Sequence, residues 1–178
     1  TRAMLFPSFC DEGNFYIGMD SLVPGSTLSL LLQFAEATAD SESGREKPVW
    51  YYLENNRWKL MRQGFEVLDD ATNGLTTSGI VRFSIPGNIS KDNTILNKSL
   101  HWLRVSVPCS TASVSELMGI HAQAVKISFA NEDQNDKLRL DTGLPAGSIS
   151  KLNEADSAVS SIEQPYESFG GRRPETEG

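Results

Sequence analysis

The clearest structural pattern in the sequence is TLSLLLQFA, residues 27–35. Its side chains Leu28, Leu30, Leu32 and Phe34 recur at every second position. Successive side chains of a strand point to opposite faces of the sheet, so this spacing predicts a strand with one face on a core. One-sided strands of this kind are typical of antiparallel sheets.

The same alternation recurs along the chain. It appears in IVRFSI (80–85), HWLRVSV (101–107) and HAQAVKISF (121–129), and a further strand is expected at NFYIGMD (14–20), before the turn residues VPGS. The residues expected on one shared face of each strand are Val81, Phe83 and Ile85; Leu103, Val105 and Val107; and Gln123, Val125, Ile127 and Phe129.

Residues 49–61, VWYYLENNRWKLM, read as a hairpin. Two aromatic-rich strands flank Asn55 and Asn56, and asparagine tolerates the positive φ that a tight two-residue turn requires. A single short helix is expected over residues 112–119, ASVSELMG, because a serine can cap its start and Gly119 can end it.

Short strands separated by turn clusters, without alternating helices, predict an all-β protein. We expect an antiparallel β-sandwich, jelly-roll or immunoglobulin-like, with at most one short helix. Residues 1–145 would form this module. Residues 146–178 are rich in Pro, Gly and Ser, and we expect them to add edge strands and an extended linker toward a following domain.

Composition excludes several classes of function. The chain has 178 residues and a net charge of −7, with Lys and Arg scattered along it. Nucleic-acid binding needs clustered cations, so we expect none. No apolar run approaches the roughly 18 residues that span a bilayer, so no membrane insertion is expected. The two cysteines, Cys10 and Cys109, permit one disulfide but do not make a disulfide scaffold.

No catalytic or metal-binding motif is present. The only histidines are His101 and His121, and HExxH, CxxC and GxSxG patterns are missing. Asp69 and Asp70, and the run NEDQND at residues 131–136, supply oxygens for Ca²⁺ but lack the spaced EF-hand pattern, so we expect solvated acidic loops. The sequence therefore predicts no enzyme, no cofactor and no metal site.

The stretch NGLTTSGIVRFSIPGN, residues 73–88, raises the question of a phosphate cradle. It lacks the GxxxxGK[ST] and GxGxxG patterns, and no helix follows it. We expect a structural connection instead, in which Gly74 and Gly79 allow tight backbone geometry and the hydroxyls satisfy backbone groups.

Exposed aromatic side chains are the remaining candidates for a site. A protein interface or a ligand platform could be formed by Trp50, Tyr52, Trp58 and Trp102. Tyr51 could also line such a ligand platform, although half of any such set on strands must face the core. On this basis a carbohydrate-binding β-sandwich module, with a glycan as ligand, is the alternative function.

A resemblance to a known family is carried by the order of five stretches: FYIGMDSLVPGSTLSLLLQFAE, VWYYLENNRWKL, DDATNGLTTSGIVRFSIP, LHWLRVSV and IHAQAVKISF. In this order and spacing they resemble baseplate assembly proteins of the J-like family, from phage-tail-like contractile injection systems. The closing residues 144–178 look like the segment that leads into the next domain in long members from Bacteroidetes-type systems.

The resemblance implies a structural, non-enzymatic role. It implies one module of a baseplate wedge protein that contacts neighbouring wedge proteins and copies of itself. The particle would be phage-tail-like and assembled in the cytoplasm. The family carries no catalytic residues, so none is transferred to this chain.

Overall fold

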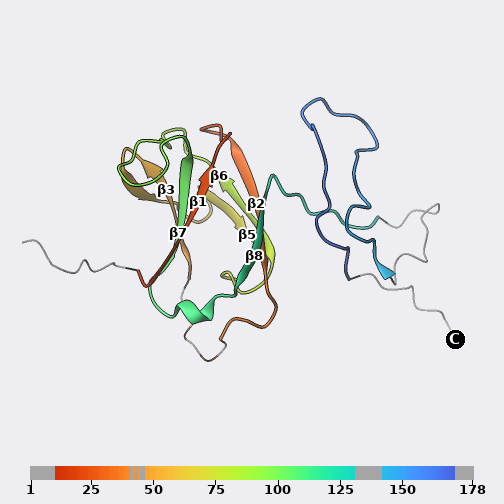
Figure 1. Cartoon of the computed structure of the whole chain (residues 1–178), viewed down its shortest axis with the longest axis horizontal. Helices are drawn as coiled ribbons and strands as arrows, with labels where there is room; N and C mark the ends of the chain where they lie inside the picture. The colour runs from red at the N-terminus through yellow and green to blue at the C-terminus, as the bar shows by residue number, and fades with distance from the viewer. Residues whose placement is uncertain (1–10, 41, 43, 45–46, 131–141, 171–178) are drawn as a thin grey trace, which may run out of the picture. The chain divides into compact units, whose positions relative to one another are not determined.

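The computed structural model describes residues 11–40, 42, 44, 47–130 and 142–170. The chain divides into two compact units, Thr1–Ile127 and Ser128–Gly178. The first unit contains two four-stranded sheets in which every strand pair is antiparallel (Figure 1). The predicted all-β sandwich is confirmed.

The first sheet, sheet A, has the strand order β1-β7-β3-β4. Its strands are β1 (Gly13–Met19), β7 (His101–Val107), β3 (Val49–Glu54) and β4 (Arg57–Leu60). Strand β1 pairs with β7 over its whole length without a register shift. It therefore forms one edge of the sheet, and the hairpin strand β4 forms the other.

The second sheet, sheet B, has the strand order β5-β6-β2-β8. Its strands are β5 (Val67–Asp70), β6 (Gly79–Ser84), β2 (Thr27–Phe34) and β8 (Leu117–Ala122). A register shift interrupts the pairing of β2 with β8 between Gln33 and Phe34. The strands predicted around residues 27–35 and 80–85 thus lie side by side in the middle of this sheet.

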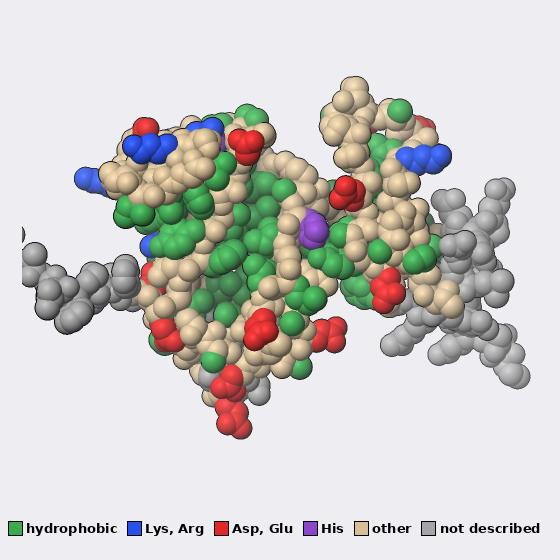
Figure 2. Space-filling view, viewed as in Figure 1, with side chains coloured by type: hydrophobic (Ala, Val, Ile, Leu, Met, Phe, Trp, Pro, Cys, Tyr) green, Lys and Arg blue, Asp and Glu red, His purple; other side chains and the backbone are tan. Residues whose placement is uncertain are grey.

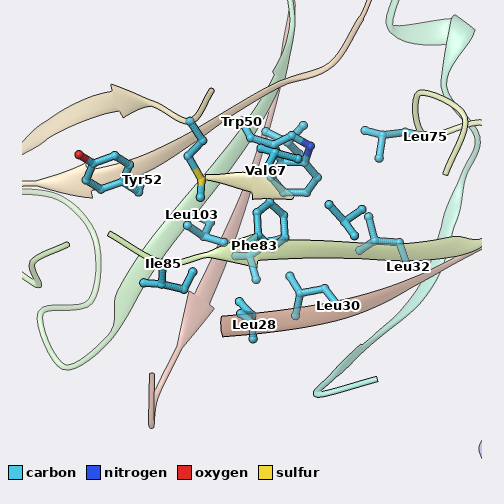
Figure 3. Packing of buried hydrophobic residues seen from close by; sticks show 14 of the residues in the cluster. Leu28, Leu30, Leu32, Trp50, Tyr52, Val67, Leu75, Phe83, Ile85 and Leu103 are labelled. Atoms are coloured by element: carbon cyan, nitrogen blue, oxygen red, sulfur yellow. The ribbon is translucent and has the colours of Figure 1, made fainter. Parts of the chain in front are cut away.

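The core lies between the two sheets and is built by the predicted alternation. Leu28, Leu30, Leu32 and Phe34 are all buried, as are the predicted inward residues of β6 and β7. In Figure 3 the β2 leucines lie beside Phe83, and the rings of Phe83 and Trp50 meet edge-on with centroids 4.9 Å apart. Figure 2 shows apolar side chains filling the space between the sheets. Burying such side chains is the main favourable term in folding.

The predicted two-residue hairpin is confirmed. Strands β3 and β4 pair up to Glu54 and Arg57, and Asn55 and Asn56 have φ angles of 47° and 60°. Two successive positive φ angles define the turn whose twist matches that of the flanking strands. The turn predicted before β2 is also present, because the Ser26 amide donates to the Val23 carbonyl over 3.2 Å.

The connection between β5 and β6 is a structural corner, as predicted. Asp70 Oδ1 accepts hydrogen bonds from the amide and the hydroxyl of the fully buried Thr72, whose Oγ1 in turn accepts from the Leu75 amide. The strand after it starts at Gly79, where an added Cβ would stand 2.4 Å from the Ala71 carbonyl oxygen. The hydroxyls satisfy backbone groups, and Gly79 allows two backbone segments to touch.

The prediction of a helix over residues 112–119 is wrong. The chain forms only a short 3₁₀ turn, Thr111–Ser113, and then enters β8. Strand β8 places Ile120 opposite Leu32 of β2, so the sheet edge supplies both backbone partners and an apolar contact. Serine-rich segments have weak helix preference, and the tertiary contact prevails.

The strand predicted over residues 121–129 is wrong beyond Ala122. Gln123 adopts a left-handed conformation with φ 56°, which turns the chain out of sheet B. Val125, Ile127 and Phe129 are consequently exposed, although the alternation predicted a buried face.

The second compact unit begins at Ser128, and the domain boundary expected between residues 145 and 146 stays a prediction. Its described residues, 128–130 and 142–170, contain no strand. Two backbone segments are joined there because the Ser168 amide donates to the Leu144 carbonyl and the Leu144 amide donates to Ser168 Oγ. Gln164 adds a side-chain bridge, donating to the Tyr166 carbonyl and accepting from the Ile149 amide.

Candidate interaction surface on sheet A

The outer face of sheet A carries a continuous row of large side chains. Tyr16 of β1 lies opposite Arg104 of β7, Arg104 lies opposite Tyr51 of β3, and Tyr51 lies opposite Leu60 of β4. Residues that face each other across neighbouring strands share one face of the sheet. The sequence neighbours of this row, such as Leu103, point into the core, so the row itself points away from it.

At the centre of this row, aromatic rings surround the guanidinium of Arg104. The Arg104 Cζ atom lies 4.1 Å from the centroid of the Tyr51 ring and 5.1 Å from that of Trp58. Trp58 in turn contacts Tyr16, with ring centroids 5.5 Å apart. A guanidinium over an aromatic face is attracted by the ring quadrupole. We call Tyr16, Tyr51, Trp58 and Arg104 the arginine cluster.

The arginine cluster leaves hydrogen-bonding capacity unused. The nearest carboxylate, that of Asp11, lies 3.9 Å from Arg104 Nη2, too far for a hydrogen bond. Among the residues that the structure describes, the Arg104 side chain donates no hydrogen bond, and its Nε is buried. A guanidinium has five N–H donors in a fixed plane, so the rings orient a group that can still bind a carboxylate or carbonyl.

A second feature holds the hairpin of the cluster in place. The Asn55 amide donates to Ser90 Oγ over 2.8 Å and the Asn56 amide donates to the Asp92 carbonyl over 2.8 Å. The Asn56 side chain accepts from the Thr94 amide. These hydrogen bonds join the loop between β6 and β7 to the turn between β3 and β4. They therefore hold the turn that positions Trp58 of the arginine cluster.

The four aromatic residues singled out from the sequence do not share one surface. Trp50 and Tyr52 face the core and are buried. Trp58 and Trp102 lie on the outer face; the Trp102 indole covers Gly18, where an added Cβ would stand 2.8 Å from the ring, and its Nε1 donates to the Asn97 carbonyl. Only two of the four therefore remain for an exposed platform.

Sequence reasoning missed two members of the cluster as site residues, Tyr16 and Arg104. The sequence held a signal for each of them. Adjacent side chains of a strand point to opposite faces of the sheet, so Tyr16 points away from the core if Ile17 points into it, and Arg104 points away if Leu103 points in. The alternation does not show that β1 and β3 flank β7. That pairing brings the three strands' outer residues together.

Other candidate chemistry has structural explanations. The pKa of His101 is lowered by burial and by the nearby charge of Lys91, so the environment of this strand histidine favours its neutral form. Asp70 is engaged by Thr72, and residues 131–136 lie outside the described residues. Within the described ranges no three His, Cys, Asp or Glu side chains gather as a metal-ligand set.

Two further observations concern the described part of the chain. It contains no helix long and apolar enough to cross a membrane. Cys109 is exposed, whereas Cys10 lies outside the described residues, so the structure does not test whether the two cysteines pair.

Comparison with known proteins gives one assignment. No curated protein matches the chain. The model of the family described as "Baseplate protein PVC11-like" matches residues 4–178. The expected baseplate role is confirmed by this match, whereas the J-like and Bacteroidetes-type attributions stay predictions. Since the match spans nearly the whole chain, the protein belongs to the family of PVC11-like baseplate proteins.

Proposed function

We propose that this chain is a non-enzymatic structural module of a baseplate wedge protein, of the J-like type expected from the sequence. It would act in a phage-tail-like contractile injection particle, assembled in the cytoplasm, by binding neighbouring baseplate proteins. The family match supports the baseplate part of this proposal. The arginine cluster supports the part that concerns protein contacts.

The observation that carries the proposal is the chemistry of the outer face of sheet A. Trp, Tyr and Arg are the residue types that contribute most of the binding energy at protein interfaces. Here they occur together, with Tyr16 42% exposed and the Arg104 side chain only 16% exposed. A partner that covers Tyr16 and Trp58 would remove water from the Arg104 guanidinium, which the aromatic rings of the cluster already orient.

The chemistry of the cluster also defines the partner. A carboxylate or a run of backbone carbonyls at the partner's contact would accept from the free Arg104 donors. Apolar or aromatic side chains around that acceptor would cover Tyr16, Trp58 and the exposed Leu60. We therefore expect a neighbouring baseplate protein that presents an acidic residue within an apolar patch.

The test is co-purification with the baseplate proteins encoded beside this chain, expressed together in defined pairs. Trp58→Ala should weaken binding to the contacting neighbour by about 2 kcal/mol, roughly 30-fold. The matched control is Phe65→Ala, because Phe65 is an exposed ring (64%) that also stacks with an arginine, Arg62 at 4.7 Å, but lies outside sheet A.

Both variants are first compared with the wild type by circular dichroism, so that a loss of binding is not a loss of folding. Equal binding by wild type and Trp58→Ala to every neighbouring baseplate protein would show that this face is not the contact. Equal loss for Trp58→Ala and Phe65→Ala would also contradict the proposal.

A further inference from the structure

A short segment after β8 has the pattern of a strand but no partner strand. In residues 125–129, VKISF, the apolar side chains Val125, Ile127 and Phe129 alternate with polar ones. They are 77%, 63% and 53% exposed. Within the described residues no hydrogen bond of this segment is found, whereas Ala124 still donates to Ser29 of β2. We call residues 125–129 the unpaired segment.

The kink at Gln123 explains why the segment does not simply prolong β8. A left-handed φ at a residue other than glycine is uncommon and directs the chain away from the sheet. A strand that has yet to join a sheet exposes alternating apolar side chains to solvent, and its backbone groups have no partner in the protein. Within the described residues, the unpaired segment has both properties. The segment could therefore add as a strand to a sheet edge, but its own sheet B offers it no such edge.

Among the strands that the structure describes, β1 is the edge that is left open to accept a further strand. The edge strand β4 carries Arg57 and Lys59, and β5 carries Asp69 and Asp70, charges that discourage strand addition. The pairing of β8 is interrupted by a register shift. By contrast β1, GNFYIGM, has no charge and no proline, pairs without interruption, and leaves Phe15 43% exposed.

We infer that the unpaired segment of one copy of this chain adds to the β1 edge of a second copy as an antiparallel strand. The inference rests on the proposed assembly role. In the register that we expect, Ile127 lies opposite Ile17, Phe129 opposite Phe15 and Val125 opposite Met19. Each apolar side chain of the segment then meets one from the core-facing side of β1.

Charge fits the same register. Lys126 is the only charged residue of the unpaired segment, and it would lie opposite Gly18, diagonal to the exposed Asp20 that follows β1. Diagonal neighbours on one face of a sheet are within reach of a long side chain. In this register the unpaired segment pairs with the stretch from Phe15 to Met19 of β1, so a second copy satisfies both edges there. A contact of this head-to-tail kind links copies into a ring or an open chain.

The first test measures self-association of the 178-residue chain by sedimentation at increasing concentration. Ile127→Asp should weaken association by at least about tenfold, because a charge replaces an apolar side chain at the contact. The matched control is Ile95→Asp, the same change at a residue that is 92% exposed in the loop between β6 and β7, which should leave association unchanged. A chain that stays monomeric, or an Ile127→Asp variant that associates like the wild type, overturns the inference.

The second test locates the contact. Phe129 is replaced by the photo-crosslinking residue p-benzoylphenylalanine, and this variant is irradiated in a mixture with ¹⁵N-labelled wild-type chain. The crosslinks are expected on labelled peptides that contain β1, centred on Phe15. Crosslinks at the Met19 end of β1, or only within the unlabelled chain, overturn it.

These outcomes are separable from those of the proposed function. If Trp58→Ala abolishes binding of a neighbouring baseplate protein while Ile127→Asp changes nothing, the arginine cluster is the contact and the strand addition is wrong. If Ile127→Asp dissociates the copies while Trp58→Ala keeps all its partners, the strand addition stands and the outer face of sheet A is not the contact.

Discussion

In the described part of the chain two arginines lie against aromatic rings, and they are held in opposite ways. Arg62, in the loop between β4 and β5, stacks on Phe65 and forms two hydrogen bonds to the Glu66 carboxylate, of 2.8 Å and 3.2 Å. Arg104, in the middle of sheet A, is surrounded by rings and has only a carboxylate at 3.9 Å. The exposed arginine is hydrogen-bonded within its own loop, whereas the half-buried one donates no hydrogen bond to any described residue.

The difference shows what each arrangement can contribute. The Arg62–Glu66 pair fixes a loop locally, with residues four apart in sequence, and solvent screens its charge. The arginine cluster joins strand β1, the hairpin β3–β4 and strand β7, three segments that are distant in sequence, and keeps its donors unused. The same residue types can therefore stabilise a loop in one place and, in another, keep the unused donors that the proposed protein contact requires.

The largest expected effect in this comparison comes from Arg104→Ala. It removes a mostly buried side chain and both ring contacts, so we expect the free energy of unfolding to fall by about 2–4 kcal/mol in urea denaturation. Arg62→Ala should cause a clearly smaller loss. Arg104→Met, which keeps the volume without the charge, should recover part of the stability. Equal losses for the two alanine variants would remove the distinction between the sites.

A smaller effect is expected from the ring over Arg104. Tyr51→Leu keeps an apolar side chain but removes the ring face, so it should lower the free energy of unfolding by about 1 kcal/mol, whereas Tyr51→Phe should stay near wild type. Phe65→Leu, the matched change at the exposed site, should have no measurable effect. Thermal unfolding followed by circular dichroism compares the three variants. A loss with Phe65→Leu as large as with Tyr51→Leu would contradict the assignment.

The smallest effect concerns Glu66 and depends on pH. The hydrogen bonds from Arg62 lower the pKa of this carboxyl from 4.5 to about 2. A carboxyl whose folded pKa is depressed stabilises the fold above its unfolded pKa, and this contribution is lost as pH falls toward the folded value. Glu66→Gln should therefore cost at most about 1 kcal/mol at pH 7 and nothing near pH 2. A difference that persists unchanged down to pH 2 would contradict this origin.

The strands could be predicted from local sequence patterns wherever one face of the strand is buried. The alternation at Leu28, Leu30 and Leu32 predicted β2, and the pair Asn55 and Asn56 predicted the turn after β3, because period and turn chemistry are local properties. The end of β8 was not predictable in this way, since nothing in the sequence around Gln123 signals a left-handed backbone. Alternation alone predicted that β8 would continue.

The candidate surface was predictable only in part. Trp58 and Trp102 were singled out as aromatic residues, but the sequence could not tell them from Trp50 and Tyr52 without the direction of each strand in the sandwich. The arginine cluster depends on β1, β7 and β3 lying side by side, which is a non-local pairing. Such pairings are fixed by packing of the whole domain rather than by any short motif.

Gly79 has a consequence for how this family can diverge. A side chain there would collide with the backbone at Ala71, whereas a Cβ added at Gly87 meets nothing within 4 Å. Over evolutionary time we expect substitutions to accumulate freely at position 87 and to be eliminated at position 79. If Gly79 is invariant in the family, the reason would then be the contact of two backbone segments and not the binding of a ligand. Residues that adapt to different partners are better sought on the outer face of sheet A.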